Sequence, residues 1–473
     1  MSALPFLLAL ALTPADVPEW GGFRGNNGAG VAESPGLPDK LSAEACGFWE
    51  ASIPPGYSSP SIAGDRVFLT AAEGTELSTI CLDRATGEER WVKTIEFSGK
   101  RTGANSPAAP SPVTDGTKLF VCFHDIGLLA YDLEGTELWR NEMPAFDIPH
   151  GMSTSPVVHG ELVILLVDQD SKSELVAFEK ETGEVRWRTE REGTTHSYST
   201  PTIYAPEQAP AQVIVSGSFQ IAGYDVETGA KIWWANGAAW QTKSVPAVVG
   251  DTCIVNAYMV PSTEFGVPAL TQSWEEILEE KDADEDGFIA REEWNDIPML
   301  QQAWFIFDLD NDEVLDREDY EYLVASGHAT GGLFAIKLDG EGDITDTHIA
   351  WKYDQKRGLP DIPSPLVMDG VIYLIKEGGI FTSIDATTGE VVKQGRIGEP
   401  DRYYASPVAA AGRIVTASHG GQLSVVSTGD EWEVVSSEDL QEEVWSTPAI
   451  AGDQVFIRTQ FALYCFKTPS REG

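Results

Sequence analysis

The segment 85–91 reads Ala-Thr-Gly-Glu-Glu-Arg-Trp, and its pattern recurs at 134–139, 181–187 and 227–233. In every copy a tryptophan stands four residues after a glycine; the pairs are Gly87 and Trp91, Gly135 and Trp139, Gly183 and Trp187, and Gly229 and Trp233. A repeat of roughly 45 residues in a strand-rich sequence is typical of a β-propeller or a solenoid.

A second marker counts the repeats. A Ser or Thr near a proline opens an apolar strand eight times, at Ser59-Pro60, Ser111-Pro112, Ser155-Pro156, Thr200-Pro201, Ser244-Val245-Pro246, Ser364-Pro365, Ser406-Pro407 and Thr447-Pro448. Successive prolines lie 52, 44, 45, 45, 119, 42 and 41 residues apart, so the fifth repeat carries an insertion. Period-2 alternation and β-branched residues predict four short strands in each repeat, in the first near 61–63, 66–70, 79–83 and 88–95.

The last repeat, 446–467, has room for only three strands. The segment 47–52 resembles a fourth strand, with Trp49 where Trp91 would stand, and pairing it with the last repeat would close the ring without an exposed edge. We therefore predict an all-β, eight-bladed β-propeller closed by the N-terminal strand. Cys46 and Cys465 would then lie near each other but out of register, which leaves a disulfide between them open.

The domain boundaries follow from this count. We expect a signal peptide at 1–15, a leader at 16–46, propeller at 47–261 and 329–468, a helical insertion in blade five at 262–328, and a tail at 469–473. The apolar run 4–12 is too short to span a bilayer, so we expect export to the periplasm or outside the cell and no membrane span. A net charge of −42 argues against nucleic acid as a partner.

The insertion contains a motif of high specificity. The stretch 282–293 reads Asp-Ala-Asp-Glu-Asp-Gly-Phe-Ile-Ala-Arg-Glu-Glu and matches the twelve-residue EF-hand loop, with glycine at its sharp turn. The expected calcium ligands are Asp282, Asp284, Asp286, the carbonyl of Phe288, and Glu293. We expect helices at 272–280 and 292–296 on either side of the loop.

A second loop, 308–319, follows. Its candidate ligands are Asp308, Asp310, Asp312, the carbonyl of Val314, and Asp319. Glu313 replaces the turn glycine and Asp319 replaces the final glutamate, so this loop either holds a metal or supports the first loop. Ile289 and Leu315 would pair across the two loops. The aromatic residues Trp274, Trp294, Trp304, Phe305 and Phe307 are expected to form the core of the pair.

The position of the insertion also matters. It falls between the second and third strands of blade five, and such loops emerge on the face that carries the blade-to-blade connections. We therefore expect the calcium-binding module to overhang the mouth of the central channel.

The repeats resemble those of the pyrroloquinoline quinone (PQQ)-type propeller family. That family's signature, Ala-x-Asp-x-x-Thr-Gly-x-x-x-Trp, is nearly intact at 81–91 and at 177–187. The opening Trp-Gly-Gly-Phe-Arg-Gly-Asn-Asn-Gly-Ala-Gly-Val at 20–31 resembles the leader of bacterial exported proteins with these repeats. The resemblance implies the fold and leaves two branches: quinoprotein dehydrogenases, which use PQQ, calcium and an aspartate base, and cofactor-free scaffolds similar to BamB.

Two departures disfavour the dehydrogenase branch. No two cysteines are adjacent, so the vicinal disulfide that covers the quinone in many of these enzymes is absent, and no convincing Asn/Glu calcium pair with a following Asp stands out. We expect calcium but not PQQ. The weak candidates for a ligand at the channel mouth are His150, His196, Tyr198, Trp240, Lys243, Arg402, Tyr403, Tyr404 and Trp445.

The preferred hypothesis is an exported, non-catalytic propeller that binds a protein or another extracellular ligand on its loop face. The first alternative is a PQQ-dependent quinoprotein oxidoreductase of the alcohol dehydrogenase type. The second alternative is a polysaccharide-binding propeller that uses the aromatic side chains of the mouth.

Overall fold

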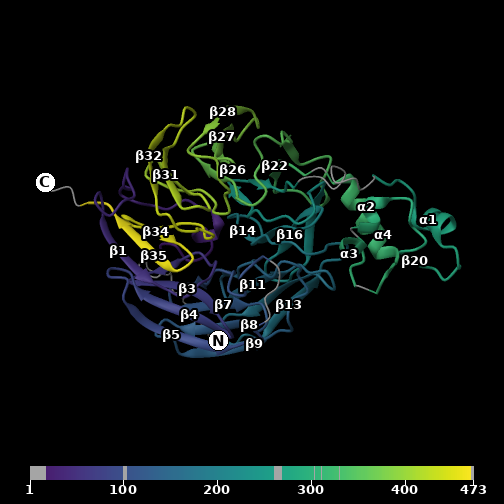
Figure 1. Ribbon diagram of the computed structural model, residues 1–473, viewed down its shortest axis with the longest axis horizontal. Helices are drawn as coiled ribbons and strands as arrows, with labels where there is room; N and C mark the ends of the chain where they lie inside the picture. The colour runs from purple at the N-terminus through teal and green to yellow at the C-terminus, as the bar shows by residue number, and fades with distance from the viewer. Residues whose placement is uncertain are drawn as a thin grey trace, which may run out of the picture.

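The computed structural model describes residues 18–99, 104–259, 269–302, 304–310, 312–329 and 331–469. Eight sheets stand around a ring, and a small group of helices lies beside them (Figure 1). The predicted eight-bladed all-β propeller is confirmed. The predicted signal peptide, the start of the insertion and the end of the tail lie outside the described residues.

Blades one to four are meanders, in which each strand pairs with the next along the chain. Their strands are β2 (Ser61–Ala63), β3 (Arg66–Glu73), β4 (Glu76–Asp83) and β5 (Glu89–Glu96); β6 (Val113–Thr114), β7 (Lys118–Phe123), β8 (Gly127–Asp132) and β9 (Glu137–Glu142); β10 (Val157–His159), β11 (Leu162–Val167), β12 (Glu174–Glu179) and β13 (Val185–Glu190); and β14 (Thr202–Tyr204), β15 (Gln212–Ser216), β16 (Gln220–Asp225) and β17 (Lys231–Asn236).

Blades five to eight repeat this plan, with the insertion after the second strand of blade five and a mixed last blade. Their strands are β18 (Ala247–Val249), β19 (Thr252–Asn256), β22 (Leu333–Lys337) and β24 (Ile349–Tyr353); β25 (Leu366–Met368), β26 (Val371–Lys376), β27 (Ile380–Asp385) and β28 (Val391–Arg396); β29 (Val408–Ala410), β30 (Arg413–Ala417), β31 (Gln422–Ser427) and β32 (Val434–Asp439); and β33 (Ala449–Ala451), β34 (Gln454–Arg458), β35 (Ala462–Lys467) and β1 (Gly47–Ser52).

Strand β1 closes the ring from the N-terminal side. It pairs antiparallel with β35, and Trp49 lies opposite Cys465 as Trp91 lies opposite Cys81 in blade one. Cys46 precedes the paired segment and Cys465 lies within it, so the two are not opposite each other, and both are free thiols. The first and last strands of the propeller therefore share one sheet, which removes an open edge.

Adjacent blades are joined by the repeated tryptophans. Each of five indole rings lies over the turn glycine of the next blade, and its Nε1–H donates to a carbonyl of that turn at 2.9–3.2 Å. The pairs are Trp49 on Gly87, Trp91 on Gly135, Trp139 on Gly183, Trp187 on Gly229, and Trp351 on Gly389. A Cβ on any of these glycines would lie 2.4–2.8 Å from the ring, and each glycine has a positive φ. The repeated glycine and tryptophan motif thus forms the contact between neighbouring blades.

Trp233 departs from this pattern. It is fully buried, and its Nε1–H donates to Gln212 Oε1 of its own blade at 2.7 Å. Its indole still packs between neighbouring sheets, in a cluster with Cys253 and Phe334 of blade five, but it does not lie over a turn glycine of that blade. The reason lies in blade five, where the short strand β23 (Gly342–Asp343) pairs in parallel with β17 and takes the place of a Thr-Gly turn.

A second set of contacts joins the blades at the hub. A backbone N–H at the start of the inner strand of one blade donates to the hydroxyl at the equivalent position of another blade, at 2.9–3.0 Å. We call these seven hydroxyls the hydroxyl belt: Ser59, Ser111, Ser155, Thr200, Ser364, Ser406 and Thr447. Val245 holds the eighth position, so the belt is interrupted in blade five.

The leader crosses the ring on the side away from the blade connections. Trp20 bridges to Ile62 of blade one, and Asn27, in the 3-10 turn η1 (Asn26–Gly28), exchanges two hydrogen bonds of 2.7 Å with the backbone of Ile203 in blade four. Val31 bridges to Ala409 of blade seven. The leader therefore ties together blades that do not touch one another.

We expect Gly183→Ala to lower the free energy of unfolding by roughly 1–3 kcal/mol, because the new Cβ would overlap Trp139 and strain the backbone at φ +72°. Gly160→Ala is the matched control in the same blade; its φ is also positive, but its Cβ would meet nothing within 4 Å. Urea denaturation followed by tryptophan fluorescence measures both variants. Equal losses would show that backbone strain, and not docking, sets the effect.

Candidate functional site

The described part of the insertion contains four helices and two short strands: α1 (Trp274–Lys281), β20 (Ile289–Ala290), α2 (Pro298–Gln302), α3 (Trp304–Phe307), β21 (Val314–Leu315) and α4 (Arg317–His328). Helix α1 starts at a capping box in which Ser273 and Glu276 bond each other's backbone N–H. The helix expected at 292–296 is not formed; residues 291–293 make a turn, and α2 begins only at Pro298. Proline suits that first position, since it has no N–H to leave unpaired.

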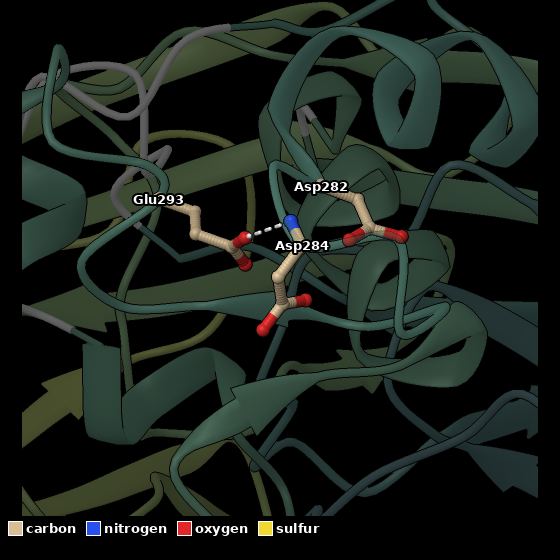
Figure 2. Close-up of side chains that lie close together, drawn as sticks. All are labelled: Asp282, Asp284 and Glu293. Atoms are coloured by element: carbon tan, nitrogen blue, oxygen red, sulfur yellow. Dashed lines mark hydrogen bonds between the residues drawn. The ribbon is translucent and has the colours of Figure 1, made fainter.

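The first acidic loop brings three carboxylates together. Oxygen atoms of Asp282, Asp284 and Glu293 all lie within 4.8 Å of one another. Figure 2 shows Glu293 directed at the backbone of Asp284, where its Oε1 accepts the Asp284 N–H at 3.3 Å and the Ala283 N–H at 2.7 Å. Gly287, with φ +91°, provides the sharp turn. Three anionic groups at this separation repel one another unless a cation lies between them.

The second loop repeats these contacts. Oxygens of Asp308, Asp310 and Asp312 also lie within 4.8 Å of one another. Asp319 takes the place of Glu293, with its carboxylate accepting the N–H groups of Leu309 at 2.9 Å and Asp316 at 3.2 Å. Burial raises the pKa of Asp319 to about 7.

The turn of the second loop is strained. Glu313 adopts φ +75°, a conformation that favours glycine, as the missing glycine predicts. The two loops are joined by β20 and β21, in which Ile289 pairs with Leu315 as expected. Trp274, Trp294, Trp304 and Phe307 are buried together below them.

The insertion contacts the ring through α4. Tyr322 packs against Phe219 and edge-to-face against Trp240, both on loops of blade four, with ring centroids 5.6 and 5.9 Å away. Figure 1 places the helices at the outer side of the ring beside β16, so the module does not overhang the channel centre as expected. Within the described residues no helix is long and apolar enough to cross a membrane.

The channel mouth holds a pocket of about 460 Å³. Six of the nine predicted mouth residues line it: His150, Tyr198, Lys243, Arg402, Tyr404 and Trp445. Trp445 is stacked between Tyr57 and Tyr404, with both centroid distances 4.6 Å. Burial lowers the pKa of His150, with His196 and Lys243 adding to the effect, which favours its neutral form.

The other three predicted mouth residues do not line the pocket. His196 is buried, with its ring bonded to Asp170 and to Gln241, and its neighbour Trp240 faces the insertion. Tyr403 points into the core of blades six and seven, where burial raises its pKa to about 12. Neighbouring residues of one connection thus point in opposite directions, which the sequence pattern did not distinguish.

Sequence reasoning missed other parts of the pocket. Phe23 of the leader, Tyr57 and Asn105 line it, together with six hydroxyls of the belt. The Ser/Thr-Pro marker that recurs in each repeat carries most of these hydroxyls, so the sequence does contain a signal for them. Nothing local in the sequence indicates that the leader enters the channel.

The family model for outer membrane protein assembly factor BamB matches residues 47–170, 134–258 and 307–472. The chain belongs to the BamB family. These matches cover most of the propeller, in agreement with the repeats and with the closing strand. No curated relative matches the chain.

Solved structures share the fold at low sequence identity. BamB from Moraxella catarrhalis is 10% identical with a TM-score of 0.55, covering 90% of this chain and 98% of its own. A europium-containing methanol dehydrogenase is 12% identical with a TM-score of 0.59, covering 94% and 98%. Quinohemoprotein alcohol dehydrogenase from Comamonas testosteroni is 11% identical with a TM-score of 0.61, covering 95% and 80%. Both branches of the fold are therefore represented.

We expect Tyr322→Ala to weaken the contact of the insertion with blade four, because the buried ring fills the space between Phe219 and Trp240. The loss should be roughly 3–5 kcal/mol of local stability. Hydrogen exchange of the α4 amides measures it. Glu321→Ala, on the exposed side of the same helix, is the control. Equal protection in the two variants would contradict the contact.

Proposed function

We propose that this chain is an exported, non-catalytic propeller that binds a protein partner on the face where the channel pocket opens, with calcium held by the helical insertion. The observation that carries the non-catalytic part is the composition of the pocket. Its described lining includes no Asp or Glu. A quinoprotein site needs carboxylates to hold calcium and to act as a base, so the residues present do not fit a calcium–PQQ pair.

An exposed aromatic side chain supports a protein partner on this face. Phe461, in the loop between β34 and β35, is 57% exposed. The next residue back, Gln460, donates its N–H to Glu443 O at 3.0 Å, which holds this loop beside the segment that carries Trp445. Aromatic side chains are enriched at protein interfaces, where they supply most of the buried apolar area.

The polysaccharide alternative has weaker support. Sugars stack on exposed aromatic faces, but both faces of the Trp445 ring are covered, by Tyr57 and by Tyr404. The apolar run at 4–12 supports the export part of this proposal.

For calcium, the first loop offers the better site. Its carboxylate cluster has the hard oxygen donors that calcium prefers, and its seventh residue, Phe288, can add a backbone carbonyl. Asp282, Asp284, Asp286 and Glu293 would hold the ion, and the second loop would hold another through Asp308, Asp310, Asp312, Val314 and Asp319. A bound ion would neutralise the repulsion within each loop and tighten the β20–β21 pair.

We expect Asp282→Ala and Glu293→Gln each to abolish the tighter calcium-binding event in calorimetry, because each removes a carboxylate from the first loop. Glu292→Gln is the matched control, since it removes the neighbouring, exposed carboxylate at a position that does not ligate in this loop type. Unchanged binding in both loop variants would refute the assignment.

The partner proposal is tested in the exporting host. We expect Phe461→Ser to reduce the recovery of a specific co-purifying protein about tenfold, the scale of one aromatic contact at an interface. Val249→Ser is the control, since Val249 is 47% exposed on the opposite face, at the end of an inner strand. Calcium- and PQQ-dependent reduction of an artificial electron acceptor with an alcohol would instead favour the oxidoreductase.

A further inference from the structure

The hydroxyl belt has unused donors. Each belt oxygen accepts one backbone N–H, but a hydroxyl also carries a proton of its own to donate. No acceptor for any of these seven protons lies among the described residues, although every belt side chain is at most 3% exposed. Buried polar groups are almost always paired, so these protons are available to an acceptor in the channel.

Six of the seven hydroxyls face one cavity. Ser59, Ser111, Ser155, Ser364, Ser406 and Thr447 all line the channel-mouth pocket. Their oxygens are fixed by the N–H groups that they accept, so the donors are already in place before a ligand arrives. A row of fixed donors along one cavity wall suits an acceptor with several lone pairs.

The charge around the pocket favours an anion. The chain carries 74 acidic and 32 basic residues, yet the described lining includes no carboxylate and contains Arg402 and Lys243. Lys243 bonds Asp361 at 2.9 Å, whereas no ion pair joins Arg402 to any described carboxylate. The described lining of this cavity is therefore free of carboxylates although the protein is strongly acidic.

Aromatic rings also line the cavity. Both faces of the Trp445 ring are covered by Tyr57 and Tyr404, but Phe23 of the leader also lies in the cavity. A ligand with a planar body would lie against Phe23 while its charged end reached the belt. A volume of about 460 Å³ is enough for a small organic molecule.

We propose that the channel pocket binds a small organic anion whose carboxylate accepts hydrogen bonds from the hydroxyl belt, with Arg402 adding charge at the rim and Phe23 lying against its planar body. This site needs no metal and no protein partner. A failure of this proposal would therefore not contradict the function proposed above, and a failure of that function would not contradict this site.

Benzoate tests the proposal, with benzamide as the neutral molecule of the same shape. Calorimetry on the purified full chain, at constant ionic strength, should show benzoate binding at least about tenfold tighter than benzamide, the effect of charge-assisted hydrogen bonds. Arg402→Gln should weaken benzoate binding about fivefold or more, and Ser111→Ala likewise. Arg186→Gln, a cation on outer strand β13, should leave it unchanged.

Ser111→Ala also removes the acceptor of the Ser59 N–H and can disturb folding, so circular dichroism accompanies it. Arg402 is exposed, so Arg402→Gln tests the site even if the serine variant unfolds. Equal binding of benzoate and benzamide, or no binding of either, would overturn the proposal and leave water as the acceptor. Equal weakening by Arg402→Gln and Arg186→Gln would also overturn it, since general attraction of anions would then explain the binding.

Discussion

The structure depends on an indole ring lying over a glycine of the next blade. A single four-stranded sheet buries too little apolar surface to be stable, so each blade needs a neighbour on both sides. At five of the eight blade interfaces the tryptophan provides that contact with a large apolar face and one directed hydrogen bond, and the glycine provides the space. Trp49 makes the same contact across the junction between the two ends of the chain, which is why the N-terminal strand can complete the last blade.

The hub adds a second, polar layer of contacts. The hydroxyl belt joins the inner strands near one end of the channel, and the leader crosses the other end, where fully buried Arg24 donates to Pro365 O at 2.9 Å. Burial lowers the pKa of Arg24 to about 9. One end of the channel is therefore held by the leader, and a ligand has access from the other, where the blade connections and the insertion lie.

The molecule separates two electrostatic environments. In the insertion, carboxylates are gathered so closely that a divalent cation would relieve their repulsion. In the channel pocket the described lining has none, and cations and hydroxyl protons dominate. The two places are linked by packed aromatic rings, since Tyr322 of α4 contacts Trp240, which contacts His196, which contacts the pocket residue Tyr198.

The sequence by itself determined the number of blades, the closing strand and the acidic loops, because these rest on local spacing: a turn glycine, a docking tryptophan and alternating aspartates each act within a few residues. Tertiary structure alone decided which side chains share the pocket. Tyr403 and Tyr404 are adjacent, yet one enters the core and the other the channel, because the connection between β28 and β29 runs between the blade core and the channel and its neighbouring side chains project to opposite sides. The place of Trp233 and the path of the leader likewise depend on partners more than a hundred residues away in the chain.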